Sequence, residues 1–299
     1  MQSYVYLIIS NESMKSTINR SLKFSGHESF HCRHFWLKKG FDHVKEGRSF
    51  SDKAGIELGV GRNMVASIRF WLKAFDITNN EGELTLLANK LLANDGWDPF
   101  LEDDATLWLL HYKLSSKQYS SIYNLVFSEL RKVKPEFSNA HLLSLVNEID
   151  TKQSSNIVGK DFSVLIRTYF AKKSKDKEES FSGLLTELNL LKEVGEDELK
   201  NKLYHVNNVR QDSIPWQIVL FCILDNEEYG KSISLNELFN NDKGVGTLFA
   251  FTREGLEGKL SEISENHPDI VYKNDAGVKE FQIKKSLNGL KILADYYEK

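Results

Sequence analysis

Cysteine and proline are scarce in this 299-residue sequence, which contains two cysteines and four prolines. Cys32 and Cys222 lie far apart and form no CxxC pair, so we expect no disulfide scaffold and a reducing cytoplasm as the location. The low proline content excludes Pro-rich and collagen-like architectures. The longest apolar runs, 5–9 and 218–224, are too short to cross a bilayer, and the N-terminus lacks the basic start and small-residue cleavage site of a signal peptide. We therefore expect a cytoplasmic protein without a membrane segment.

The composition is that of an ordinary globular protein, but its charge is unevenly distributed. Hydrophobic residues make up 41% and charged residues 27%, which excludes a mainly disordered chain. The formal net charge is −3, yet residues 1–75 carry 12 Lys and Arg against 6 Asp and Glu, and residues 76–110 carry 8 acids and one base. A local basic surplus attracts phosphates even in a mildly acidic protein. The alternative is that these charges only solvate helix surfaces.

Helical periodicity dominates the first third of the chain. A short helix over 51–58, a glycine-bearing break at 59–61 and a longer helix over 64–75 predict a helix-turn-helix. The expected apolar face of the short helix consists of Ala54, Ile56 and Leu58. Residues 77–86 read as strand, turn and strand, the wing of a winged helix, and a helix follows over 86–92.

The rest of the chain is expected to be helical, with one further hairpin. Helices are predicted over 102–114, 119–133, 139–149, 162–170 and 181–203, with a charged linker at 172–180. A second unit begins near Ser213, with helices over 214–225, 235–240, 252–265 and 287–297 and a β-hairpin over 269–284.

The predicted fold class is therefore mainly α with small β wings. Winged-helix units are expected at both ends of a helical middle. The boundaries are 20–114 for a winged-helix DNA-binding domain, 115–205 for a helical middle domain and 213–299 for a second winged-helix-like domain.

Residues 27–31 read H-E-S-F-H, a formal H-E-x-x-H motif. On a helix the two imidazoles of this motif share one face and bind Zn²⁺ while the glutamate activates water, so a zinc metallopeptidase is one interpretation. Gly26 directly before the motif and the lack of a third ligand at the usual spacing argue against it, although His34 is a conceivable third ligand. The alternative is a set of structural histidines near a helix start.

A second cluster of polar residues lies at 95–104, where Asp98, Glu102 and Asp103 are close in sequence. Clustered carboxylates can hold Mg²⁺ for phosphodiester cleavage. The same residues also make an ordinary acidic first turn of a helix, which the helix dipole favours. We prefer the second interpretation.

The longer helix of the helix-turn-helix carries side chains suited to nucleic acid. The residues assigned to DNA binding are Arg62, Asn63, Ser67, Arg69 and Lys73, together with the nearby Lys38 and Lys39. Arg62 and Asn63 at the helix start are expected to reach bases, whereas Lys73 serves only phosphate. Double-stranded DNA is thus the expected partner. A non-enzymatic winged helix that docks or regulates another protein is the alternative.

Several ordered motifs resemble one bacterial family. They are FSGHESF at 24–30, the following Arg33, LGVGRNMVASIRFW at 58–71, DPFLED at 98–103 and TLWLLH at 106–111. The chain resembles the domain-of-unknown-function family found beside DNA phosphorothioation and phage-defence genes, which includes the B component of the Ssp system. Further matches near the C-terminus extend the resemblance over nearly the whole chain.

The resemblance implies a function in DNA modification or defence. It implies DNA binding alongside other components of a system that replaces a non-bridging phosphate oxygen with sulfur, and a DNA-nicking endonuclease activity with Mg²⁺ or Mn²⁺ as its cofactor. No other cofactor and no resident metal site are expected. His27, Glu28 and Arg33 match the family's Gly-His-Glu-x-Phe…Arg core and offer a base, a carboxylate and a phosphate clamp for catalysis. The alternative is a structural ion pair between Glu28 and Arg33.

Overall fold

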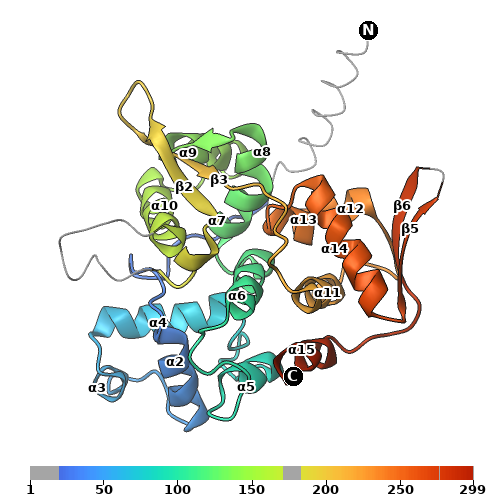
Figure 1. Cartoon of the computed structure of the whole chain (residues 1–299). Coiled ribbons are helices and arrows are strands. Elements are labelled where there is room, and N and C mark those ends of the chain that lie inside the picture. Colours follow the sequence, from blue (N-terminus) through green and yellow to red (C-terminus); the bar gives the residue numbers. More distant parts are fainter. Residues whose placement is uncertain (1–19, 171–182, 276, 299) are drawn as a thin grey trace.

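The computed structural model describes residues 20–170, 183–275 and 277–298; the apolar run at 5–9 and the expected linker at 172–180 lie outside these ranges. Helices form most of the described chain and two small antiparallel three-stranded sheets accompany them (Figure 1). This confirms the prediction of a mainly α fold with small β elements. Within the described ranges no helix combines the length and hydropathy needed to span a bilayer. Both cysteines are buried and free, as expected.

The N-terminal part follows the predicted order of helices. Its helices are α2 (Trp36–Lys45), α3 (Ala54–Leu58), α4 (Arg62–Ala74), α5 (Leu86–Leu92) and α6 (Asp104–Lys117). Gly59 ends α3 in the left-handed conformation, with φ of 64°, and Gly61 precedes the first residue of α4 in an extended conformation. Because glycine adopts the left-handed region without a Cβ penalty, the G-V-G sequence produces the predicted turn between the two helices.

Two local predictions in this part were wrong. Ile56 does not face the core but is 86% exposed, while Ala54 and Leu58 are buried. A helix of five residues is too short for its apolar spacing to define one buried face. The segment 77–86 contains no pair of strands either: it forms a turn closed by one isolated bridge between Thr78 and Leu84.

The middle of the chain is partly helical. Its elements are α7 (Ser121–Asn124), the π-helix η1 (Leu125–Leu130), α8 (Arg131–Val133), β1 (Glu136–Phe137), α9 (Asn139–Ile149), α10 (Ser155–Tyr169), the 3₁₀-helix η2 (Thr186–Leu188), β2 (Leu191–Glu196) and β3 (Lys202–Val206). The helix predicted over 181–203 is wrong where the structure describes it. Residues 191–206 form a β-hairpin that β1 extends, in the order β1-β3-β2.

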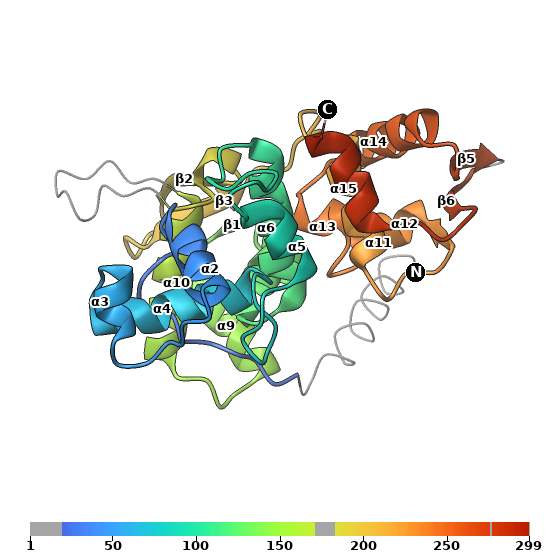
Figure 2. The ribbon, with the colours of Figure 1, turned by 90° about the horizontal axis from the view of Figure 1, so that it is seen from below.

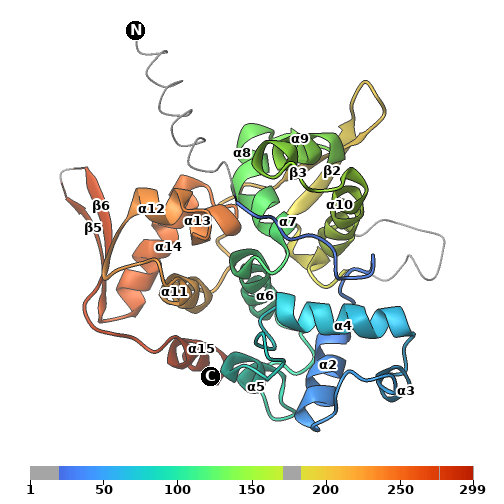
Figure 3. The same cartoon turned by 180° about the vertical axis from the view of Figure 1, so that it is seen from behind.

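The C-terminal part matches its prediction closely. Its elements are α11 (Trp216–Asp225), β4 (Ser232–Ser234), α12 (Leu235–Asn240), α13 (Val245–Leu248), α14 (Arg253–Asn266), β5 (Ile270–Asp275), β6 (Val278–Ile283) and α15 (Gly289–Tyr297). The predicted hairpin is β5–β6, and β4 completes a sheet in the order β4-β6-β5. In Figures 2 and 3 this hairpin projects at the end of the molecule opposite α3 and α4.

Helix α6 lies at the centre, where the three parts meet (Figure 1). Its residues from Ala105 to Ser115 are all buried, and the helix packs against α4, α7, α11 and α13. The Lys113 ammonium on α6 lies 3.2 Å from Asp76 after α4 and 2.7 Å from Asp225 at the end of α11. Burial opposes the charged form of Lys113, but the two carboxylates raise its pKa above the ordinary value.

A buried histidine, His111, makes a second set of polar contacts between α6 and other parts of the chain. The ring of His111 lies within hydrogen-bond distance of the Tyr169 hydroxyl on α10, at 2.7 Å from Nδ1, and of the Leu248 carbonyl on α13, at 2.8 Å from Nε2. The carbonyl can only accept, so Nε2 carries the proton and Nδ1 accepts from the hydroxyl. Burial lowers the pKa of His111 from 6.5 to about 4.

The neutral form of His111 makes stability depend on pH. The unfolded chain binds a proton at His111 below its ordinary pKa of 6.5, whereas the folded chain binds it only near pH 4. We expect the free energy of unfolding to fall by about 1.4 kcal/mol per pH unit from this group as the pH drops from 6.5 towards 4. Urea titrations of wild type and His111→Gln across this range measure the effect. Parallel pH profiles of the two proteins would contradict it.

Candidate functional site

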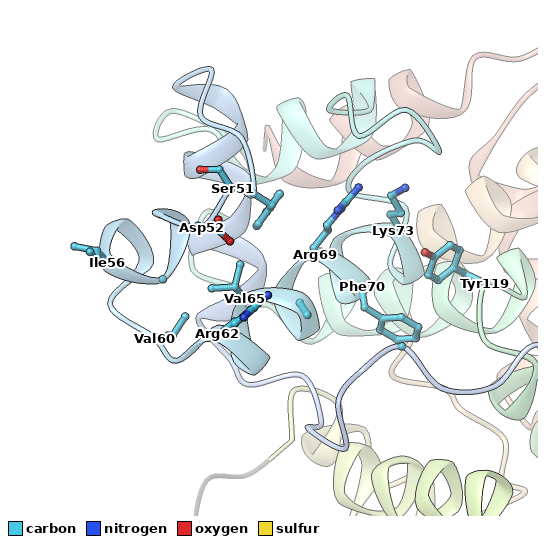
Figure 4. Close-up of a pocket in the computed structure, with 14 residues that line it drawn as sticks. Ser51, Asp52, Ile56, Val60, Arg62, Val65, Arg69, Phe70, Lys73 and Tyr119 are labelled. Carbon is cyan, nitrogen blue, oxygen red and sulfur yellow. The ribbon is translucent and has the colours of Figure 1, made fainter.

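A groove of about 1120 Å³ runs along the outer face of α4. We call it the α4 groove. Ser51, Asp52, Ile56 and Val60 lie on one side and Tyr119 lies on the other (Figure 4), and Phe50 and Gly26 also line the groove. A smaller hollow of about 400 Å³ shares Arg69 and Lys73 with this groove and continues it past Arg48.

Three predicted DNA-binding cations lie together in the α4 groove. Arg62, Arg69 and Lys73 all line it, and their spacing of seven and four residues places them on one helix face, about 10 Å and 6 Å apart along the axis. In Figure 4 the side chains of Arg69 and Lys73 point in the same direction. The sequence spacing therefore produces a row of cations in the structure.

The charge of this row is not neutralised by neighbouring acids. Arg62 and Arg69 are exposed, and neither forms an ion pair within the described ranges. The Lys73 ammonium donates a hydrogen bond to the Asn80 carbonyl at 2.7 Å. Asp76, the acid that follows α4, is already held by Lys113 and Lys117 at 3.2 and 3.1 Å. The three cations thus remain available to an anionic ligand.

The other assigned DNA-binding residues differ in accessibility. Asn63 is exposed at the start of α4, and Lys39 is exposed on α2 with its ammonium 3.4 Å from the Leu58 carbonyl. Ser67 is fully buried and cannot reach a ligand. Lys38 is also buried, and its ammonium bonds to Asp42 and Asn94 at 2.6 and 2.8 Å. Ser67 and Lys38 were wrongly assigned, because both face the interior.

The loop at 25–29, which supplies Gly26 to the α4 groove, has an unusual backbone. Ser25, Gly26, Glu28 and Ser29 all have positive φ, at 72°, 99°, 47° and 61°. An added Cβ at Gly26 would lie 2.8 Å from the buried Phe70 ring, so glycine permits the close approach of this loop to α4. Such backbone persists only where surrounding contacts determine it.

Those contacts centre on a buried pair, His27 and Asp161. Asp161 on α10 is 1% exposed; its carboxylate accepts the Ser25 N–H at 2.9 Å and lies 3.0 Å from Nε2 of His27. The Ser29 N–H donates to Nδ1 of His27 at 3.2 Å, which assigns the ring proton to Nε2, the nitrogen nearer the carboxylate. The imidazole also stacks on Trp71 of α4, with ring centroids 6.1 Å apart. The pair therefore joins the loop, α4 and α10.

Two further side-chain hydrogen-bond donors hold the backbone at Ser29 and Phe30. Arg167 on α10 donates to the Ser29 carbonyl at 2.7 Å, and the indole N–H of Trp71 donates to the Phe30 carbonyl at 3.2 Å. Both bonds attach loop backbone to a helix. The position of the loop is thus set by side chains of α4 and α10.

This geometry corrects the zinc interpretation of residues 27–31. The segment is a turn with left-handed residues, so His27 and His31 do not share a helix face. The described residues contain no group of three His, Cys, Asp or Glu side chains that could hold a metal ion. The three-ligand donor set that zinc requires is therefore not assembled there.

The three residues assigned to catalysis differ in their surroundings. His27 is buried, Glu28 is exposed, and the Arg33 guanidinium lies 5.3 Å from the centre of the Trp36 ring. Glu28 forms no ion pair with any described residue, so the suggested pair with Arg33 is not formed. The imidazole meets Asp161 instead, which points to a role in positioning the loop.

The acidic cluster at 95–104 is structural, as we preferred. Asp98 accepts the N–H groups of Glu102 and Asp103 at 2.9 and 3.1 Å. Asp103 is the N-cap of α6 and accepts the Ala105 N–H at 2.8 Å. These carboxylates therefore satisfy the backbone donors of a helix start.

Sequence reasoning missed Asp161, Tyr119 and Phe50. One signal was available for Asp161: it lies three residues after Val158 and four before Leu165, on the buried stripe of α10. A carboxylate on an apolar stripe requires a buried partner. Tyr119 and Phe50 lie in loops, and no local pattern connects them with α4.

Comparisons with known proteins agree on one family and one fold. The family model described as "Protein of unknown function (DUF4007)" matches residues 24–297. Two solved structures are similar over 94% of this chain and 89% of theirs, at 24% sequence identity: "Magnesium ion-bound SspB crystal structure", with a TM-score of 0.82, and "SspB crystal structure", with a TM-score of 0.80. At this identity the likeness establishes a shared fold. No curated protein matches the sequence.

The close approach of the loop to α4 gives a stability prediction. Gly26→Ala places a Cβ against Phe70 at a φ of +99°, and we expect it to lower the free energy of unfolding by about 2–4 kcal/mol. Gly47→Ala is the matched control, because its φ is +72° but no atom lies within 4 Å of the new Cβ; it should cost only about 1 kcal/mol. Urea unfolding measures both losses. Equal losses would show that the contact with Phe70 is not tight.

Proposed function

The chain belongs to the DUF4007 family of proteins of unknown function, and from this membership we propose that it is a DNA-binding component of a bacterial DNA phosphorothioation or anti-phage defence system. Double-stranded DNA is its proposed ligand, and other proteins of the system are its proposed partners. The shared fold with SspB supports the assignment to such a system. The resemblance of residues 24–30 and 98–111 to this family supports the same assignment.

One observation carries the DNA-binding part of the proposal: the row of cations along the α4 groove. Two exposed guanidiniums without ion pairs and one ammonium bound only to a carbonyl provide positive charge in a concave surface. Phosphate contacts of this kind supply most of the sequence-independent affinity for nucleic acid. At the start of α4, the exposed Arg62 and Asn63 are positioned to contact bases.

We further propose that the two ends of the chain are winged-helix units. In the C-terminal part the order helix, strand, helices, strand, strand from α11 to β6 supports this assignment. In the N-terminal part the support is the helix order from α2 to α5. The two units differ in the charge of these helices: α14, the last helix before the β5–β6 hairpin, carries four glutamates against two cations, Arg253 and Lys259, whereas α4 carries three cations and no acid. We therefore assign DNA binding to the N-terminal unit alone.

Charge reversal on α4 tests the DNA-binding proposal. We expect Arg62→Glu combined with Arg69→Glu to weaken binding of a labelled duplex by about tenfold or more at physiological salt, and to reduce the dependence of affinity on salt. Fluorescence anisotropy over a series of salt concentrations measures both effects.

The matched control reverses two charges far from α4. Lys231 and Lys291 are exposed in the C-terminal part, so Lys231→Glu with Lys291→Glu changes the net charge equally. This control should retain nearly the affinity of wild type. Equal weakening of both double variants would indicate a response to net charge and would remove the α4 groove from the proposal.

Strand nicking remains a prediction from the family resemblance, and no arrangement of the described residues favours it as a second function. The resemblance predicts that the protein converts supercoiled plasmid into the open circle with Mg²⁺ or Mn²⁺. Because Glu28 is the exposed carboxylate of the family core, Glu28→Gln should then abolish nicking and leave DNA affinity unchanged. Gel electrophoresis of the plasmid measures the conversion. Retained DNA binding without relaxation would remove the nicking activity and leave the binding function.

A further inference from the structure

The α4 groove is charged along its floor and not along its rims. Arg62, Arg69 and Lys73 all lie on α4. The rim beside α3 presents Asp52 and the 86% exposed Ile56, which points away from the helices into the open (Figure 4). A duplex laid over the groove would place its two phosphate backbones against the two rims. Of the residues that line the groove, none outside α4 is a cation, and Arg48 lies in the smaller hollow beyond it.

Aromatic rings accompany the cations. Phe50 and Tyr119 both line the groove and are half-buried. Each ring is held by a neighbour: Phe50 packs on His43 with centroids 4.9 Å apart, and Tyr119 packs on Phe70 with centroids 5.3 Å apart. Rings held in this way lose little conformational entropy when a planar group stacks on them.

We propose that the α4 groove holds an unpaired stretch of one DNA strand, with its phosphates along α4 and its bases against Phe50 and Tyr119. This inference rests on the proposed DNA-binding function and specifies the form of DNA that enters the groove. A single backbone matches a single row of cations, and unpaired bases expose the faces that stack on aromatic rings. An unpaired base also exposes amino groups, such as that of cytosine, from which the Asp52 carboxylate can accept a hydrogen bond.

The Asp52 carboxylate helps to distinguish the two forms of DNA. Against a duplex backbone it repels phosphate at short range. Beside an unpaired base it is a hydrogen-bond acceptor in a suitable position. The same side chain therefore opposes one form and favours the other. The target in this arrangement is a duplex that is locally open, such as one with a gap.

The test compares three labelled DNAs of one sequence: an intact duplex, the same duplex with a short internal gap, and the single strand that spans the gap. Fluorescence anisotropy gives the affinity of wild type for each. We expect the gapped duplex and the single strand to bind about tenfold more tightly than the intact duplex. An intact duplex that binds as tightly as the gapped one overturns this inference and leaves the proposed function standing. Absence of binding to all three overturns the proposed function.

Two variants and one control test the role of the rings. Phe50→Leu and Tyr119→Leu should each weaken binding of the gapped duplex by about tenfold. Phe100→Leu is the matched control, because Phe100 is 55% exposed and lies outside the lining of the groove. Unchanged affinity of both groove variants for the gapped duplex overturns the assignment of the rings.

A measurement on the wild-type protein avoids dependence on the folding of these variants. A 2-aminopurine placed in the gap loses fluorescence when it stacks on an aromatic ring. We expect its emission to fall when wild type binds. Binding that leaves the emission unchanged shows that the bases do not stack in the groove and overturns the proposal.

Discussion

The fold depends on two polar side chains in the buried helix α6. His111 connects α10 with α13, and Lys113 connects the end of α4 with the end of α11. Both groups are removed from water, so each must be satisfied by partners from other parts of the chain. The directional contacts of these two residues therefore connect the N-terminal, middle and C-terminal parts through α6.

Most of the fold was predictable because its helices are defined by local sequence. The G-V-G turn before α4 and the first turn of α6 are set by residues within a few positions of each other. The hairpin β2–β3 was not predictable in this way. Its Leu-, Glu- and Lys-rich sequence has helical propensity, but its strand β3 also pairs with β1, about 70 residues earlier in the chain, where Glu136 lies opposite His205. A contact so distant in sequence leaves no local pattern.

The candidate site, like the fold, is set partly by local sequence and partly by contacts between residues that are far apart in the sequence. The spacing of Arg62, Arg69 and Lys73 defines one helix face without knowledge of the fold. Burial of Ser67 and Lys38 depends on which side of α4 and α2 packs inward. The pairing of His27 with Asp161 joins residues 134 positions apart, so no local pattern could indicate this partner of His27.

The different charges of α4 and α14 impose an orientation on any polyanion that approaches. Because the whole protein has a formal charge of −3 and fields at physiological salt decay within about 8 Å, there is little attraction from afar. In the proposed function, capture of DNA would then follow near contact, at the cationic end. The glutamate-bearing end, on the opposite side in Figures 2 and 3, is then directed away from the nucleic acid.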